Sequence, residues 1–198
     1  PLAYKVHPYS WPTIGKDISH IENATLDDVK NFFYRHYAPN NAVLAVAGNV
    51  VPDEVFRLAE KWFSGIPSRQ VPHRKLPVEP VQTEMRELIV KRKVPADVLQ
   101  LCFHIGKRND PDFFVTDLLS DVLSNGPSSR LYQKLVKDEQ LFSDVNAYIS
   151  GDMDPGLFTV SGRVMPGVSV EVAETAIWRE LSDIAGAGPG ERELQKVK

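Results

Sequence analysis

The chain has 198 residues, of which 42% are hydrophobic and 25% are charged. These values are typical of a globular protein with a buried core, and they exclude extended disorder. The 23 Lys and Arg and 26 Asp and Glu residues leave a net charge of −3, so a global attraction to nucleic acid or to anionic membranes is excluded. No apolar run approaches the roughly 18 residues of a membrane span, and we expect no membrane insertion.

The first part of the chain predicts a helix, a strand and a second helix. Thr25 and Asp28 have the spacing of a capping box, and apolar residues then recur at helical intervals as far as Tyr37. The short apolar run 42–47 predicts a strand, and Pro52 suits the first turn of a helix that ends near Gly65. Aromatic residues on the first helix are interpreted as core: Phe32, Phe33, Tyr34 and Tyr37.

Four closely spaced prolines indicate a boundary between two domains: Pro67, Pro72, Pro77 and Pro80. No helical or strand period runs between them, which is typical of a semi-extended linker. We therefore predict the end of one domain at residues 1–66, a linker at 67–80 and most of a second domain at 81–198. Since the chain starts without Met and stops within a helical pattern, we expect it to be a piece of a longer protein.

After the linker, the pattern predicts strands at 83–93, 98–106, 142–150 and 157–164, and helices at 110–125, 129–139 and from 169 to about 186. Short turns join neighbouring strands. The predicted fold class is α+β, with a mainly antiparallel sheet and helices packed on one of its faces. Cys102 lies in the apolar run 98–103 and is interpreted as a small buried hydrophobic residue.

Catalytic motifs are absent from the sequence. The five histidines, His7, His20, His36, His73 and His104, form no His-Glu-x-x-His motif or its inverse, and a single cysteine cannot build a metal cluster. Phosphate-binding glycine loops are also missing. Arg130 follows two serines and is interpreted first as part of a helix start, with a surface or interdomain salt bridge. Composition and pattern alone thus predict an α+β fragment without a catalytic centre.

Six short sequence segments (phrases), in this order along the chain, resemble segments of one protein family. They are His7–Gly15, Thr25–Phe33, Tyr37–Asn49, Glu60–Pro67, Leu118–Gly126 and Ser128–Leu135. Their content and spacing are similar to those of the pitrilysin/insulinase zinc metallopeptidases, and most similar to bacterial members that resemble the mitochondrial processing peptidase. The resemblance covers nearly the whole chain.

The resemblance implies a parent protein with two similar domains, the first of which holds zinc through a His-x-x-Glu-His helix and a downstream Glu. These ligands lie upstream of the first matching phrase, so no metal or catalytic residue is carried over to this chain. Zinc is expected in the parent and not in this fragment. The fragment is expected to be scaffold and wall of the chamber in which peptides are cleaved.

The family often holds its substrate with an Arg and, seven residues later, a Tyr. The corresponding positions here are Val136 and Ser143, so the resemblance implies that the pair is missing. Arg130 and Tyr148 are the nearby candidates to bind substrate in its place.

Two readings of the parent stay open. Loss of the pair is typical of the zinc-bearing subunit of a split enzyme, which works with a second family subunit in a homo- or hetero-dimer. It is equally compatible with an inactive partner or structural subunit. One cysteine suits either the bacterial cytoplasm or the periplasm.

Overall fold

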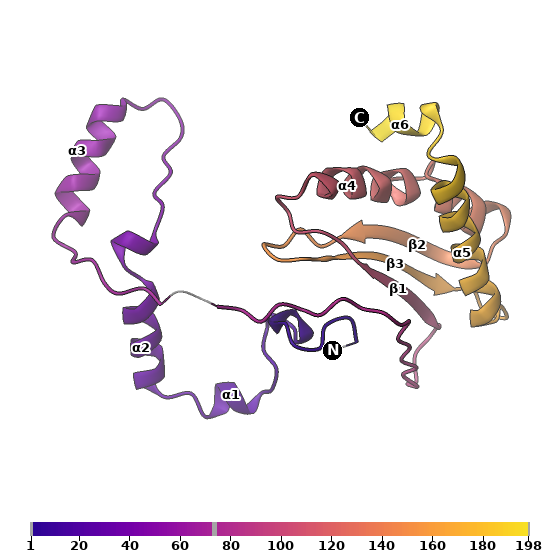
Figure 1. The fold of residues 1–198 in the computed structure, drawn as a ribbon, viewed down its shortest axis with the longest axis horizontal. Coiled ribbons are helices and arrows are strands. Elements are labelled where there is room, and N and C mark those ends of the chain that lie inside the picture. Colours follow the sequence, from indigo (N-terminus) through magenta and orange to yellow (C-terminus); the bar gives the residue numbers. More distant parts are fainter. Residues whose placement is uncertain (1, 73–74, 198) are drawn as a thin grey trace. The chain divides into compact units, whose positions relative to one another are not determined.

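The computed structural model describes residues 2–72 and 75–197, and the chain divides into two compact units, Pro1–Met85 and Arg86–Lys198 (Figure 1). Part of the predicted linker, including His73, lies outside the described residues. The elements of the first unit are η1 (Pro8–Ser10), α1 (Ser19–Glu22), α2 (Leu26–His36), η2 (Pro39–Asn41) and α3 (Pro52–Phe63).

Both long helices of the first unit begin where local signals predict. The Thr25 side chain accepts from the backbone N–H of Asp28, while the Asp28 carboxylate accepts from the backbone N–H of Thr25, which closes the capping box. The Asp28 carboxylate also accepts from the Thr25 hydroxyl, and this bond, with the smaller effect of the bond from the Thr25 N–H, holds the pKa of Asp28 below its ordinary value. Pro52 occupies the first turn of α3, where its missing N–H costs nothing. The two predicted helices are therefore confirmed.

Two predicted strands are wrong. Residues 42–47 carry no strand, and Val43 is 96% exposed. Residues 83–93 likewise lack strand pairing, and Ile89 is 73% exposed. A strand forms only where a neighbouring strand accepts and donates its backbone hydrogen bonds. The described part of the first unit contains no strand, and β1 of the second unit pairs with β3 rather than with residues 83–93.

The aromatic residues of α2 do not form a core, contrary to the sequence interpretation. Phe32, Phe33, Tyr34 and Tyr37 are each at least half exposed, although Phe33 and Tyr37 stack with ring centroids 4.9 Å apart. Trp62 of α3 is also exposed. The helical spacing identified an apolar face, but burial requires a second element that covers it.

The second unit is an antiparallel sheet covered by helices. Its elements are β1 (Val98–His104), α4 (Pro111–Ser124), η3 (Tyr132–Asp138), β2 (Phe142–Ile149), β3 (Leu157–Val164), α5 (Val170–Ala187) and α6 (Glu191–Val197). The strand order is β1-β3-β2, so β3 lies in the middle. Figure 1 shows α4 and α5 over the sheet. The predicted α+β class and antiparallel pairing are confirmed.

The core lies between one face of this sheet and the helices. Val160 of the central strand is fully buried, and its register partners Leu101 and Ala147 point to the same side. Gly162 allows the Phe142 ring to approach, because a Cβ at this glycine would lie 2.6 Å from the ring. The residues of the core are Val122, Leu123, Leu131, Leu135, Phe142, Val145, Ala147, Phe158, Val160, Val164, Ala173, Ala176, Ile177 and Ile184.

The opposite face of the sheet, which carries Cys102, is not covered by the helices of the second unit (Figure 1). Burial alternates along β1, and Cys102 falls on an exposed position, so its interpretation as a buried residue is wrong. Its Sγ lies 3.7 Å from the hydroxyl of Thr159 and 3.5 Å from the amide nitrogen of Gln100. The apolar run suggested a strand buried on both faces, whereas helices cover only one face.

The predicted helix 129–139 contains a π-helix, η3, rather than a regular α-helix. The segment ends at Gln140, whose φ of 53° lies in the left-handed region that glycine adopts readily and other residues do not. Leu135 is fully buried within η3 and anchors it to the core.

Replacing Gln140 by Gly is expected to stabilise the chain by about 0.5–1 kcal/mol, because glycine removes the steric cost of the left-handed conformation. Urea unfolding followed by circular dichroism measures the effect. Lys137→Gly is the matched control, since Lys137 is exposed within η3 and its replacement is expected to destabilise by about 1 kcal/mol. A destabilised Gln140→Gly variant would contradict the expectation.

Candidate functional site

Arg130 forms a two-pronged ion pair with Glu193. Its Nε and Nη2 donate to the two carboxylate oxygens of Glu193 at 3.0 and 2.8 Å, and both side chains are less than a third exposed. The pair joins the turn before η3 to α6, 63 residues later in the chain. The sequence predicted a surface or interdomain salt bridge for Arg130. The structure shows an ion pair, but one that is largely buried and lies within a single unit.

This pair shifts the protonation of both groups. The hydrogen bond from Arg130 holds the pKa of Glu193 below its ordinary value, and the same bond raises the pKa of Arg130. Glu193 thus stays ionised in the folded chain at a pH where the unfolded chain protonates it. The stabilisation is present above the unfolded Glu pKa, about 4.3, and is lost as the pH falls through the lower folded pKa.

Glu193→Gln is therefore expected to cost about 1 kcal/mol of unfolding free energy at pH 7 and clearly less near pH 3. Urea unfolding at both pH values measures this difference. Glu191→Gln, an exposed change on the same helix, serves as the control and should have little effect at either pH. A cost for Glu193→Gln that is the same at pH 7 and pH 3 would contradict the assignment.

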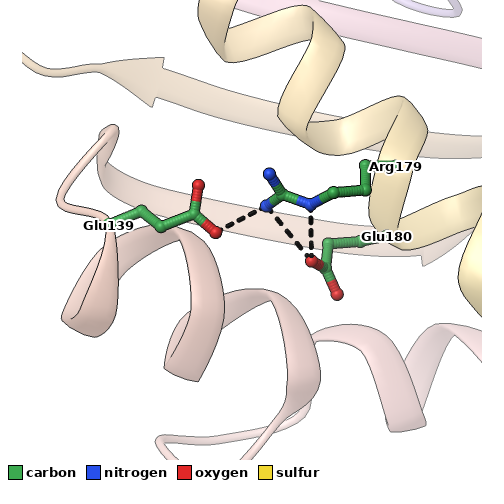
Figure 2. Close-up of polar contacts among 3 residues, drawn as sticks. All are labelled: Glu139, Arg179 and Glu180. Carbon is green, nitrogen blue, oxygen red and sulfur yellow. Dashed lines mark hydrogen bonds and ion pairs between the residues drawn. The ribbon is translucent and has the colours of Figure 1, made fainter.

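A second charged cluster lies at the end of η3 (Figure 2). Arg179 of α5 donates to Glu139 at 2.5 Å and, through Nε and Nη2, to Glu180 at 3.3 Å. The Glu180 side chain is only 6% exposed, whereas Arg179 is 46% exposed. Arg179 therefore compensates a buried carboxylate from the solvent side and also ties α5 to the end of η3.

The two ion-pair clusters border one open depression of about 510 Å³. The groups around it are both acidic and basic, and those in the ion pairs are already engaged with one another. The ion pairs link α6 and α5 to the η3 region. The mixed charges around the depression give it no strong preference for an anion or a cation. Its lining residues are Ser128, Arg130, Gln133, Lys134, Glu139, Arg179, Glu180, Asp183 and Glu193.

Val136 and Ser143 offer no substitute for the Arg and Tyr that the resemblance implies at their positions. Val136 is partly buried and packs against the core, and its side chain has no hydrogen-bond donor. Ser143 lies at an irregularity of β2, where its hydroxyl is near the Asp144 carboxylate (3.2 Å) and the Arg163 carbonyl (3.4 Å).

The two candidate substrate-binding residues, Arg130 and Tyr148, differ in how available their side chains are to a ligand. Arg130 is committed to Glu193 beside α6, whereas Tyr148 is 49% exposed on the uncovered face of the sheet, in register with Thr159. Tyr148 can therefore meet a ligand without breaking an ion pair, and Arg130 cannot.

Sequence reasoning missed the partners of these arginines. Glu193 could not be paired with Arg130 because no local signal joins residues 63 positions apart. Glu180 did have a signal, since it falls at helical spacing among the buried residues Ala173, Ala176, Ile177 and Ile184. A charged residue on an otherwise apolar stripe predicts a buried ion pair.

The described residues do not fit a zinc centre. Within 2–72 and 75–197, no three residues of the types His, Cys, Asp and Glu come together in a group that could hold a metal ion. His7 is buried, and its Nδ1 accepts from the backbone N–H of Tyr9. His104 lies on β1 and His36 in α2, each in a different unit.

None of the helices in the described part of the chain combines the length and the apolar character needed to cross a membrane.

Comparison with known proteins identifies the family. The family described as peptidase M16 inactive domain matches residues 23–198, so the chain belongs to this family. The zinc protease PqqE of Helicobacter pylori is 30% identical over 201 residues, which are 99% of this chain and 45% of that protein. The resemblance inferred from the sequence phrases is thus confirmed.

Solved structures agree with this assignment. A crystal structure of a protease from Helicobacter pylori has a TM-score of 0.86 and 29% identity, and the match covers 99% of this chain and 48% of that one. The peptidase M16 inactive domain from Pseudomonas fluorescens, at 21% identity, has the same fold, with a TM-score of 0.74 over 98% of this chain and 46% of that one. The chain spans about half the length of these relatives.

Proposed function

We propose that this chain is the non-catalytic half of a zinc metalloendopeptidase that cleaves peptides or unfolded segments. The observation that carries the proposal is the match to an inactive peptidase domain over residues 23–198, together with relatives that are named zinc proteases and are about twice as long. In this proposal zinc and the catalytic groups belong to the other half. The chain supplies scaffold and one wall of the substrate chamber.

We also propose the domain assignment made from the sequence. Residues 1–66 are the end of the zinc-bearing domain, 67–80 the linker and 81–198 most of the second domain. The division of the chain at Met85 and Arg86, close after the linker, supports this assignment. The exposed apolar face of α2 supports a partner, either another part of the same protein or a second family subunit.

For substrate binding we favour Tyr148 over Arg130. Tyr148 is half exposed on the uncovered sheet face and its hydroxyl can donate to a peptide carbonyl, while the Arg130 guanidinium is held by Glu193.

The purified 198-residue chain is expected to bind no stoichiometric zinc near neutral pH and to cleave no unfolded peptide alone. Metal analysis after dialysis and a fluorogenic peptide assay measure both properties. A 1:1 zinc content that survives dialysis, with loss of stability on chelation, would contradict the proposal.

The second candidate is a catalytically inactive partner or structural subunit, with which the missing Arg and Tyr at positions 136 and 143 are equally compatible. The presence or absence of His-x-x-Glu-His in the complete natural protein separates the two candidates. A protein without this motif that still activates a zinc-bearing partner would be the inactive subunit.

A further inference from the structure

Glu79 is held by the opposite end of the first unit. Its Oε1 accepts from the backbone N–H of Lys5 at 2.6 Å, and its Oε2 accepts from those of Val6 and His7, both at 2.9 Å. Three consecutive amides therefore surround one carboxylate, as in the backbone nests that bind anions. Hydrogen bonds from N–H groups to an ionised carboxylate are shorter and stronger than neutral ones.

The segment that supplies these amides is well packed. Tyr4 and His7 are only 6% and 4% exposed. The rings of His7 and Tyr9 lie edge to face with centroids 4.3 Å apart, and Tyr4 and Tyr9 meet in the same way at 5.6 Å. The three amides thus belong to a segment that its own aromatic contacts already shape.

Glu79 is also restricted before it binds. Pro80 follows it directly, and a residue that precedes proline is confined to extended conformations. Pro77 lies two residues earlier and limits the chain further. Less conformational entropy is therefore lost when the carboxylate is fixed among the amides.

We propose that Glu79 is a clasp that fastens the proline-rich linker to residues 5–7. The contact joins residues 72–74 positions apart and fixes the linker only a few residues before the second unit begins at Arg86. The end of the linker is then tied to the first unit through residues 5–7. This inference does not depend on the proposed peptidase function.

Amide hydrogen exchange of the 198-residue chain, read by mass spectrometry on peptides from residues 2–11, tests the clasp. Glu79→Gln keeps the shape of the side chain but removes its charge and one accepting oxygen. We expect exchange of the Lys5, Val6 and His7 amides to rise at least tenfold, with α2 and α3 unchanged. Glu84→Gln makes the same chemical change at an exposed position just after the linker and should leave all these rates as they are.

Two results would overturn the proposal. In the first, exchange at residues 5–7 in Glu79→Gln stays within twofold of that in the unaltered chain and in Glu84→Gln. In the second, exchange rises equally in α2 and α3, which would make Glu79 a general stabiliser of the first unit and not a local clasp.

Discussion

The complete natural protein, if it carries an intact zinc motif, is expected to cleave peptides poorly by itself and to gain on the order of 10²-fold when an Arg and a Tyr are restored at positions 136 and 143. An Arg guanidinium can hold a substrate carbonyl or carboxylate with a planar pair of hydrogen bonds, and a Tyr hydroxyl can orient the bond to be cleaved. Val136 has no donor and packs on the core, and the Ser143 hydroxyl lies near Asp144 and the Arg163 carbonyl.

The measurement compares kcat/KM for an unfolded peptide in the unaltered protein, in Val136→Arg/Ser143→Tyr, and in the unaltered protein mixed with a family partner that carries the pair. Val136→Met/Ser143→Phe is the matched control, because it adds similar bulk without the donors. The partner should restore the rate without any substitution. Full activity of the unaltered protein as a single species, insensitive to a second chain, would rule out this division of labour.

The second large effect concerns stability. Arg179→Met is expected to lower the unfolding free energy by about 1–3 kcal/mol, because it leaves the Glu180 carboxylate buried without the cation that compensates it. The loss is smaller than for a fully buried pair, since Arg179 is 46% exposed and water already screens part of the attraction. Urea unfolding at pH 7 measures it.

Two further variants separate the buried contact from the exposed one. Arg179→Met/Glu180→Gln removes the uncompensated charge and should recover much of the stability that Arg179→Met loses. Glu139→Gln breaks the more exposed contact, with Glu139 at 35% exposure, and should cost under about 1 kcal/mol. The assignment fails if Glu139→Gln costs as much as Arg179→Met, or if the double variant is no more stable than the single one.

The starts of the helices could be predicted because their signals lie within one turn. Thr25 caps α2, Pro52 opens α3 and Ser169 caps α5 through the N–H of Val172. Such contacts need no distant residue, so they are already present in the local sequence. Strands β2 and β3 were also predictable, because a turn joins them and places them beside each other.

Residues 42–47 show the limit of the same reasoning for strands. Their apolar, β-branched composition satisfies the local preference for a strand, but a strand also needs a neighbour for its backbone groups, and the described part of the first unit offers none. Cys102 shows the corresponding limit for burial, since alternation along β1 shows which residues share a face and not which face the helices cover.

For the candidate site too, some features could be predicted from the sequence and others appear only in the tertiary structure. The order and spacing of the phrases from His7 to Leu135 were enough to identify the family, and residues 136 and 143 were enough to expect no Arg/Tyr pair there. Only the tertiary structure shows that Arg130 is held by Glu193, that Glu180 is buried behind Arg179 and that the amides of residues 5–7 hold Glu79. Local order is encoded within a few residues, whereas these contacts join residues that only the folded chain brings together.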